Sequence, residues 1–270
     1  MRSGIVSRTA TYWPLYLLER DGVVELVELG STAAGVDALL AGRVDLAATC
    51  PDVFIARGAP VRIASGLVDR PPAWIVARPE VADLADLRGR RIATTAPAGS
   101  VSIFLRGLLR ECGLGREDYR EVVVGTTPAQ SEALMAGRVD AAMLTVPFDE
   151  PLAALGFQRL AYVGDALGPA AFTTVNVRAG WTASDEWPSL RDALANAVSR
   201  LASNDGRARE LRALADATGQ ALTAAPRIEH DERIPTAGLE RLLELMRLEG
   251  APPDATASRL VEPTAAVDLA

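Results

Sequence analysis

Two hydrophobic patterns alternate along residues 1–178. Short apolar runs, such as residues 43–49 and 61–68, predict buried strands. Between them lie stretches with apolar residues at positions i, i+3 and i+4, such as residues 31–42, which predict helices. Strands and helices that alternate at this spacing are typical of parallel β–α–β units, so the pattern predicts an α/β fold.

The same patterns give an expected order of elements. Strands are expected at residues 4–9, 23–30, 43–49, 61–68, 73–78, 90–97, 119–125, 138–147, 157–165 and 170–178. Helices are expected at residues 12–22, 31–42, 50–60, 81–89, 98–113, 127–137, 148–156, 189–204, 206–219 and 237–250. Residues 251–270 are rich in Pro and Ala and predict a loose terminal segment.

One pentapeptide, Ala-Gly-Arg-Val-Asp, occurs at residues 41–45 and again at residues 136–140. In both places it ends a predicted helix with a glycine and begins a predicted strand. We interpret the repeat as the same structural position in two α/β lobes of similar design, the alternative being local sequence preferences common to α/β proteins. The two aspartates, Asp45 and Asp140, are expected to accept hydrogen bonds from nearby backbone N–H groups.

Composition removes several classes of function. The chain has 270 residues, 49% hydrophobic residues and a net charge of −7, and it carries no basic stripe, which argues against nucleic-acid binding. All 28 basic residues are arginine, so lysine chemistry is excluded. The single histidine, His230, lies in a polar segment and is expected at the surface. With no metal-ligand spacing around Cys50 or Cys112, neither a metal nor a cofactor is expected.

The N-terminal sequence predicts a location. It lacks the apolar core of a secretory signal, and no stretch approaches the length of a membrane span. We therefore expect a cytoplasmic monomer for the chain as written, and a periplasmic or cell-surface protein if the true start lies upstream.

Candidate ligand-binding residues follow from the α/β fold. In such sheets, ligands bind beyond the carboxyl ends of the strands, beside helix N-termini. The predicted loops at those positions hold small hydroxyl residues, glycines, two aromatic residues and one arginine. The candidates are Arg8, Thr9, Tyr12, Trp13, Thr32, Thr49, Cys50, Ser65, Gly99, Ser100, Thr126, Thr127 and Thr145.

Several candidates have a structural alternative. Tyr12 and Trp13 would stack on a planar ligand or belong to the core, and Arg8 would pair with an anionic group or lie solvated in a loop. Ser31 and Ser100 would cap their helices. The backbone N–H groups of residues 100–102 are suited to donate hydrogen bonds to an anionic or carbonyl oxygen of a ligand.

The chain offers little for catalysis. Cys50, at a predicted strand end, is the best candidate nucleophile, but the sequence provides no evident base for it. Cys112 is expected to pack within a helix. No catalytic set is predicted.

The ordered motifs of the chain resemble one family. Residues 86–92 (Asp-Leu-Arg-Gly-Arg-Arg-Ile), 99–100, 113–118 and 133–147 follow, in order, the pattern of ABC-transporter solute-binding proteins for sulfonates, taurine, nitrate and thiamine-pyrimidine precursors. Residues 12–22 and 38–47 resemble the corresponding part of the first lobe. The segment before the second strand is shorter than in the family.

The resemblance implies a two-lobed periplasmic-binding-protein-like fold of type 2. Each lobe would be a mainly parallel sheet flanked by helices, and two crossing strands, near residues 74–78 and 173–178, would join them. Lobe one would comprise residues 1–75 and 176–270, and lobe two residues 80–172. The implied function is to close on a polar, anionic or heteroaromatic solute, with an ABC permease as partner if the chain is exported. The alternative is a cytoplasmic enzyme on the same fold, with lyase, decarboxylase or pyrimidine-precursor chemistry.

Overall fold

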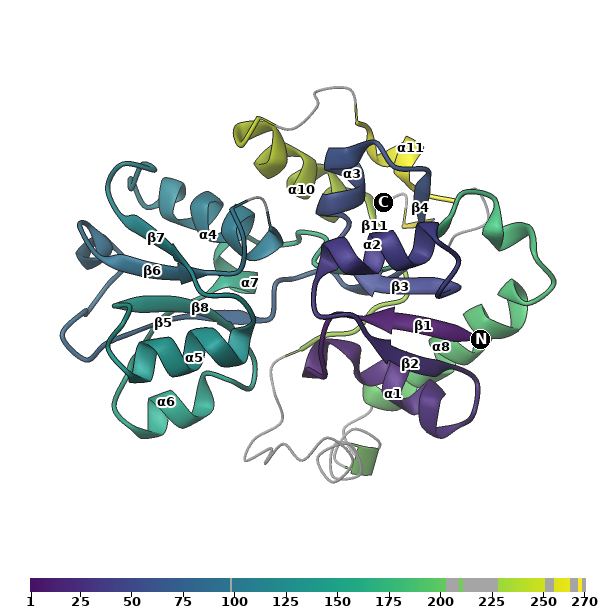
Figure 1. Ribbon diagram of the computed structural model, residues 1–270, viewed down its shortest axis with the longest axis horizontal. Coiled ribbons are helices and arrows are strands. Elements are labelled where there is room, and N and C mark those ends of the chain that lie inside the picture. Colours follow the sequence, from purple (N-terminus) through teal and green to yellow (C-terminus); the bar gives the residue numbers. More distant parts are fainter. Residues whose placement is uncertain (98, 203–208, 211–227, 251–254, 263–266, 269–270) are drawn as a thin grey trace. The chain divides into compact units, whose positions relative to one another are not determined.

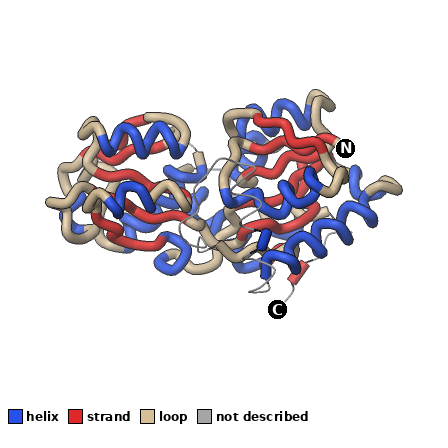
Figure 2. Tube along the Cα trace, turned by 90° about the horizontal axis from the view of Figure 1, so that it is seen from below, coloured by secondary structure: helices blue, strands red, loops and turns tan. Residues whose placement is uncertain are grey.

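The computed structural model describes residues 1–97, 99–202, 209–210, 228–250, 255–262 and 267–268. The chain forms two compact units, shown with their elements in Figure 1. Unit 1 comprises Met1–Asp69 and Pro169–Ala270, and unit 2 comprises Arg70–Gly168. In each unit, strands are flanked by helices (Figure 2), which confirms the predicted α/β class.

Unit 1 is built on a five-stranded sheet with the order β2-β1-β3-β10-β4. β1, β2 and β3 are parallel, and β10 runs antiparallel to both β3 and β4. Figure 1 shows α1 and α2 on opposite sides of this sheet. The described elements of unit 1 are β1 (Arg2–Ile5), η1 (Ala10–Tyr12), α1 (Trp13–Arg20), β2 (Glu25–Glu28), α2 (Thr32–Leu40), β3 (Leu46–Thr49), α3 (Asp52–Arg57), β4 (Val61–Val68), β10 (Thr173–Arg178), η3 (Trp181–Ala183), α8 (Trp187–Ala202), β11 (Ile234–Pro235), α10 (Thr236–Leu248), α11 (Ala257–Leu260) and β12 (Val267–Asp268).

Unit 2 repeats this arrangement with the order β7-β6-β8-β5-β9. β6, β7 and β8 are parallel, and β5 runs antiparallel to β8 and β9. α4 covers one side of the sheet, and α5 and α6 cover the other (Figure 1). The elements of unit 2 are β5 (Ala73–Ala77), η2 (Ala85–Leu87), β6 (Arg91–Thr94), α4 (Ser100–Glu111), β7 (Arg120–Val123), α5 (Thr127–Met135), β8 (Ala141–Thr145), α6 (Glu150–Ala154), β9 (Gln158–Tyr162) and α7 (Val163–Ala166).

The repeated pentapeptide occupies equivalent positions in the two sheets. β3 and β8, which follow the two copies, are each the third strand in their sheet order. Gly42 and Gly137 have positive φ angles of 66° and 68°, as expected of glycines that end helices. Asp45 and Asp140 each accept a 2.8 Å hydrogen bond from the backbone N–H of the first residue of a neighbouring strand. The interpretation of the repeat as one structural position used twice is therefore confirmed.

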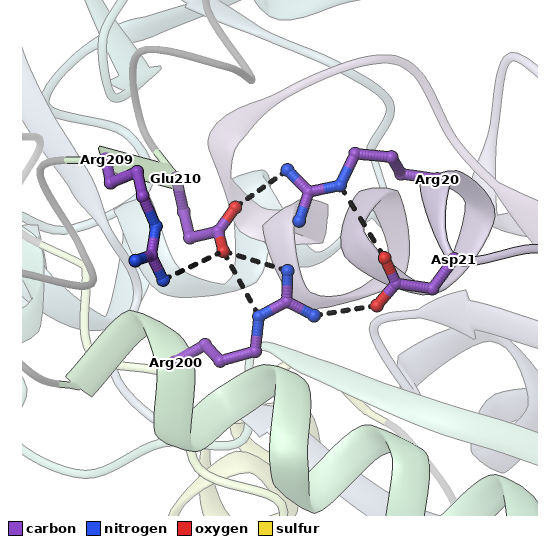
Figure 3. A network of polar contacts seen from close by, with 5 residues as sticks. All are labelled: Arg20, Asp21, Arg200, Arg209 and Glu210. Carbon is purple, nitrogen blue, oxygen red and sulfur yellow. Dashed lines mark hydrogen bonds and ion pairs between the residues drawn. The ribbon is translucent and has the colours of Figure 1, made fainter.

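An ion network around the buried carboxylate of Glu210 holds residues 209–210 against α1 and α8 of unit 1 (Figure 3). The carboxylate of Glu210 accepts a 2.7 Å hydrogen bond from Arg20 and a 2.8 Å bond from Arg200. Arg200 also pairs with Asp21 at 2.7 Å, and Arg209 lies 3.7 Å from Glu210. The hydrogen bond from Arg20, together with the Arg200 guanidinium, lowers the pKa of Glu210 to about 2.

Some predicted elements differ from the structure. The helix expected at residues 81–89 is only the turn η2, and the strand expected at residues 157–165 ends at Tyr162, where α7 begins. Of the helix expected at residues 206–219, only residues 209–210 are described.

The terminal segment is not uniformly loose. Residues 257–260 form α11, and Val261 makes a β-bridge to Ile63 of β4. The buried side chain of Leu260 anchors the segment on unit 1. Glu262 is also buried, and its carboxylate accepts hydrogen bonds from Gly180 N–H and the Thr182 hydroxyl.

The strands expected to cross between lobes lie inside the sheets. β5 pairs within unit 2 and β10 within unit 1. The chain passes from one unit to the other at residues 69–70 and 168–169, a few residues before each of these strands. Among the described helices, none is long and apolar enough to cross a membrane.

Candidate functional site

In each unit most candidate residues lie at the end of a strand, in the loop that follows it or at the start of the next helix, and Ser65 lies inside β4. Arg8, Thr9, Tyr12 and Trp13 follow β1 in unit 1. In unit 2, Ser100 begins α4 after β6. Each set therefore lies at the carboxyl edge of its own parallel strands, where α/β proteins bind ligands. The contacts of these residues decide which of them have polar groups available for a ligand.

Arg8 is already paired within unit 1. Its Nε lies 3.1 Å from Glu28 Oε1, and its Nη1 lies 3.3 Å from Glu19 Oε2. Its guanidinium carbon is 5.5 Å from the centre of the Tyr16 ring. An anionic ligand at Arg8 would therefore compete with two carboxylates for the same guanidinium. The Thr9 hydroxyl is buried and hydrogen-bonded to that of Thr11.

Tyr12 and Trp13 belong to the core of unit 1. Their exposed fractions are 6% and 2%, and burial raises the pKa of the Tyr12 hydroxyl. The Trp13 ring lies 6.1 Å from the ring of His230, whose Nε2 is 3.2 Å from the carbonyl oxygen of Ala10. The expectation of an exposed His230 is wrong, because its ring packs against the start of α1 and is partly buried.

Two candidates at the end of β3 are held by other parts of unit 1. Asn176 of β10 donates 3.1 Å hydrogen bonds to both the hydroxyl and the carbonyl oxygen of Thr49. The Cys50 thiol is buried and donates to the carbonyl oxygen of Ala171 at 3.8 Å. Cys112, by contrast, is exposed, because the end of α4 leaves it outside the core, so the expectation that it packs is wrong.

Ser65, in β4, is covered by residues 228–235. Its hydroxyl donates a 2.8 Å hydrogen bond to the carbonyl oxygen of Glu232, which also accepts from Gly66 N–H at 3.0 Å. Asp231 N–H in turn donates to Leu67 O at 3.2 Å. These bonds join residues more than 160 positions apart in the sequence, with 167 between Ser65 and Glu232, which is why local patterns could not predict them.

In unit 2, two helix starts lie beside candidate residues. α4 begins after Gly99 and α5 after Thr126, and neither N-cap residue makes a side-chain capping bond. Ser31 in unit 1, by contrast, caps α2 by accepting a 3.1 Å bond from Ala34 N–H, as predicted for that residue. Ser100 is the first helical residue of α4 and does not cap it. First-turn N–H groups without a side-chain cap are suited to bind an anion, since the helix dipole is positive there.

Hydroxyl groups lie close to these helix starts. The Thr145 hydroxyl, at the end of β8, donates to the Thr127 hydroxyl at 3.1 Å. Ser102 donates a 2.6 Å hydrogen bond to Ala96 O, which fixes the loop before α4. The side chains of Ser100 and Thr127 are partly buried, and that of Thr126 is exposed. This edge therefore combines N–H donors with hydroxyl groups.

Two further polar residues, Thr94 and Gln130, both make hydrogen bonds to Gly125 in the turn before α5. Gln130 donates to Gly125 O at 2.9 Å, while Thr94 O accepts from Gly125 N–H at 3.3 Å. The remaining oxygens, Thr94 Oγ1 and Gln130 Oε1, are buried and have no hydrogen-bond partner among the described residues. Buried polar atoms of this kind are usually satisfied by water or a ligand.

Comparison with known proteins places the chain in a family. A family model described as NMT1/THI5-like matches residues 19–175, which is more than half of the chain. The chain belongs to the NMT1/THI5-like family. No curated protein sequence matches it significantly.

Solved structures with the fold of this NMT1/THI5-like chain include solute-binding proteins of ABC importers. The alkanesulfonate-binding protein SsuA of Xanthomonas axonopodis pv. citri, bound to MOPS, is 20% identical, with a TM-score of 0.79 and 97% of each chain covered. The periplasmic aliphatic sulphonate binding protein SsuA of Escherichia coli is 18% identical, with a TM-score of 0.78 and coverage of 97% of this chain and 96% of that one.

A third structure is the ligand-binding component of an ABC-type import system from Staphylococcus aureus, with zinc bound. It is 15% identical, with a TM-score of 0.78 and coverage of 98% and 96%. These matches confirm the predicted periplasmic-binding-protein-like fold. Among the described residues of this NMT1/THI5-like chain, no group of three His, Cys, Asp or Glu side chains is placed to hold a metal ion.

Sequence analysis missed Asn176, Thr94 and Gln130 in this NMT1/THI5-like chain. Asn176 interrupts an apolar strand, and this polar residue among buried neighbours was a signal that could have been used. Thr94 and Gln130 carry no such signal, because Thr94 ends its strand in a run of small residues and Gln130 lies in a short helix without a distinct apolar face.

Proposed function

We propose that the chain is a solute-binding protein whose ligand carries an oxyanion, and that a sulfonate is the first class to test. The observation that carries the proposal is the pair of helix starts, α4 and α5, which have no side-chain cap among the described residues. N–H groups at such positions, together with the hydroxyls of Thr127 and Thr145, match the several acceptor oxygens of a sulfonate.

The proposal rests on the candidates of unit 2. There, Gly99, Ser100, Thr126, Thr127 and Thr145 bind the anionic group. In unit 1 most of the polar candidate side chains already have protein partners. Thr32 is its best remaining polar candidate, because it is partly exposed at the first position of α2.

The structural relatives support this choice of ligand and partner. Two of them are described as binding proteins for alkanesulfonates or aliphatic sulphonates, and the first contains MOPS, which is itself a sulfonate. The third is described as a component of an ABC-type import system. We therefore propose an ABC permease as the partner of this chain.

Calorimetric titration with ethanesulfonate tests the proposal, with the uncharged diethyl sulfone as the matched control. Saturable binding of ethanesulfonate at one site is expected, with the sulfone at least about tenfold weaker, because hydrogen bonds to a charged acceptor contribute more than those to a neutral one. Equal affinity for both compounds, or binding of neither, would contradict an oxyanion site.

A second experiment with the same ligand separates a binding protein from an enzyme. The buried Cys50 thiol contacts the Ala171 carbonyl oxygen, so we expect no covalent chemistry there. After prolonged incubation, mass spectrometry should recover ethanesulfonate unchanged from both the wild-type chain and Cys50→Ser. Turnover by the wild type that Cys50→Ser abolishes would instead support the enzyme alternative.

A further inference from the structure

Unit 1 contains a cavity of about 410 Å³ at the end of the sheet opposite Cys50 and Ser65. It lies where α3 ends, where β4 begins and beside α11, which Figure 1 shows close together. β3 and β4 run in the same direction, since both are antiparallel to β10, so the start of β4 is remote from the carboxyl edge. The cavity is thus separate from the candidate site described above.

The charged residues around this cavity are all arginines. Arg57, Arg62 and Arg259 line it, and no acidic residue is among its ten lining residues. Three cations around one cavity stand out in a chain with a net charge of −7. A local cluster of this kind attracts anions even when the whole molecule is acidic.

Most of the N–H donors of these three guanidinium groups make no hydrogen bond with the described residues. Arg57 donates one 2.7 Å bond to Asp37, and Arg62 donates one 2.9 Å bond to the carbonyl oxygen of Val61. The side chain of Arg259 makes no hydrogen bond or ion pair with the described residues. Because each guanidinium has five N–H donors, the three side chains retain donors for an oxyanion.

The rest of the cavity suits an apolar group. Ala56, Ala59 and Ala255, which are exposed or partly exposed, line it together with the more buried Leu260. Two of the four carbonyls near the end of α3, which would repel an anion, accept hydrogen bonds instead: Ile55 O from Gly58 N–H at 3.1 Å and Phe54 O from Ala59 N–H at 3.0 Å. Gly58 allows this closure because its φ is +58°.

We propose that this cavity binds a small amphipathic organic anion, with its oxyanion at the arginines and its apolar part against the lining alanines and Leu260. The volume lies within the range of about 300–1,000 Å³ that is usual for small-molecule pockets. The cavity thereby gives the chain a second ligand site, within unit 1 and independent of the strand ends.

Binding of 4-fluorophenyl phosphate, followed by ¹⁹F NMR line broadening, tests this site. Saturable broadening is expected for the wild-type chain, with much weaker broadening of the neutral 4-fluorobenzyl alcohol. Arg57→Gln and Arg259→Gln should each weaken binding about tenfold, since each removes a charged hydrogen-bond donor. Arg191→Gln is the matched control, because Arg191 and Arg57 are similarly exposed (47% and 43%) and each pairs with one aspartate.

A Ser100→Pro variant shows which site the probe occupies. If the probe binds the cavity, this change at the start of α4 leaves the broadening intact. Broadening that Ser100→Pro removes and the two cavity variants retain would place the probe at the strand ends and overturn the proposal. The absence of saturable probe binding to the wild-type chain would also overturn the proposal. So would binding of the chain to anionic lipid vesicles without binding of the small probe.

Discussion

Gly66 is the position where unit 1 has least tolerance for a side chain. A Cβ atom there would lie 1.8 Å from the carbonyl oxygen of Arg233, within the segment that covers the end of β4. The close approach exists because Gly66 N–H and the Ser65 hydroxyl both donate to Glu232 O. Residues 228–235 and β4 therefore depend on each other.

Replacing this glycine should destabilise the chain. Gly66→Ala is expected to lower the free energy of unfolding by about 2–3 kcal/mol, because the covering segment must move and lose its hydrogen bonds. Urea unfolding followed by circular dichroism measures the change. Gly238→Ala is the control: its nearest neighbour is 3.4 Å away, so stability should stay equal or rise by up to about 1 kcal/mol. Equal effects of the two substitutions would contradict the predicted clash.

Glu210 makes the stability of unit 1 depend on pH. Hydrogen bonds from Arg20 and Arg200 lower its pKa from an ordinary value of 4.5 to about 2. A lowered carboxyl pKa stabilises the folded state above pH 4.5, and this contribution is lost as the pH falls from 4.5 toward 2.

The Glu210→Gln substitution should therefore cost about 1–3 kcal/mol at pH 7 and progressively less below pH 4.5. Urea unfolding at pH 7, 4 and 3 measures the difference between the two proteins. Glu244→Gln serves as the control, because Glu244 is exposed and its pair with Arg241 should contribute only about 0.5 kcal/mol. A Glu210→Gln effect that does not change with pH would rule out this ion network as the cause.

The two repeat strands, β3 and β8, differ in one useful way. Both aspartates accept a backbone N–H bond, but Asp140 also forms an ion pair with Arg91, at 2.9 Å from its Nη2. That side-chain hydrogen bond lowers the pKa of Asp140. Unit 2 therefore gains a charge interaction that unit 1 does not show at the equivalent aspartate.

Matched substitutions in the repeat measure this difference. Asparagine keeps an acceptor for the backbone N–H but loses the negative charge. Asp140→Asn should lower the free energy of unfolding at pH 7 by about 1–2 kcal/mol and Asp45→Asn by less than about 1 kcal/mol. The extra loss should fade as the pH falls below the ordinary aspartate pKa of about 3.9 toward the lowered pKa of Asp140 in the folded chain. Equal losses at pH 7 would show that the ion pair contributes nothing.

The repeat also shows which features local sequence patterns could predict. Helix-ending glycines and apolar strands are local features, so the order of elements and the equivalence of β3 and β8 could be predicted. The partners of the candidate residues could not. Arg8 pairs with Glu19 and Glu28, and Ser65 bonds to Glu232, because folding brings distant segments together.

Each unit has its own sheet, and unit 2 is a continuous stretch of chain. Its core includes Val76, Ala142 and Leu144, which come from two strands of one sheet. A continuous segment with its own buried core is expected to fold alone. A fragment of residues 70–168 should therefore show a cooperative urea transition by circular dichroism, and a non-cooperative transition would contradict this independence.

The central claim is that the N–H groups at the start of α4 bind an oxyanion. Ser100→Pro removes one of these donors, and proline suits the first helical position; Gly99 before it has φ −82° and ψ 156°, which proline also allows. Ser100→Ala keeps the N–H and removes only the hydroxyl. Calorimetry with ethanesulfonate should show about tenfold weaker binding for Ser100→Pro than for Ser100→Ala. Equal affinities of the two variants would contradict the claim.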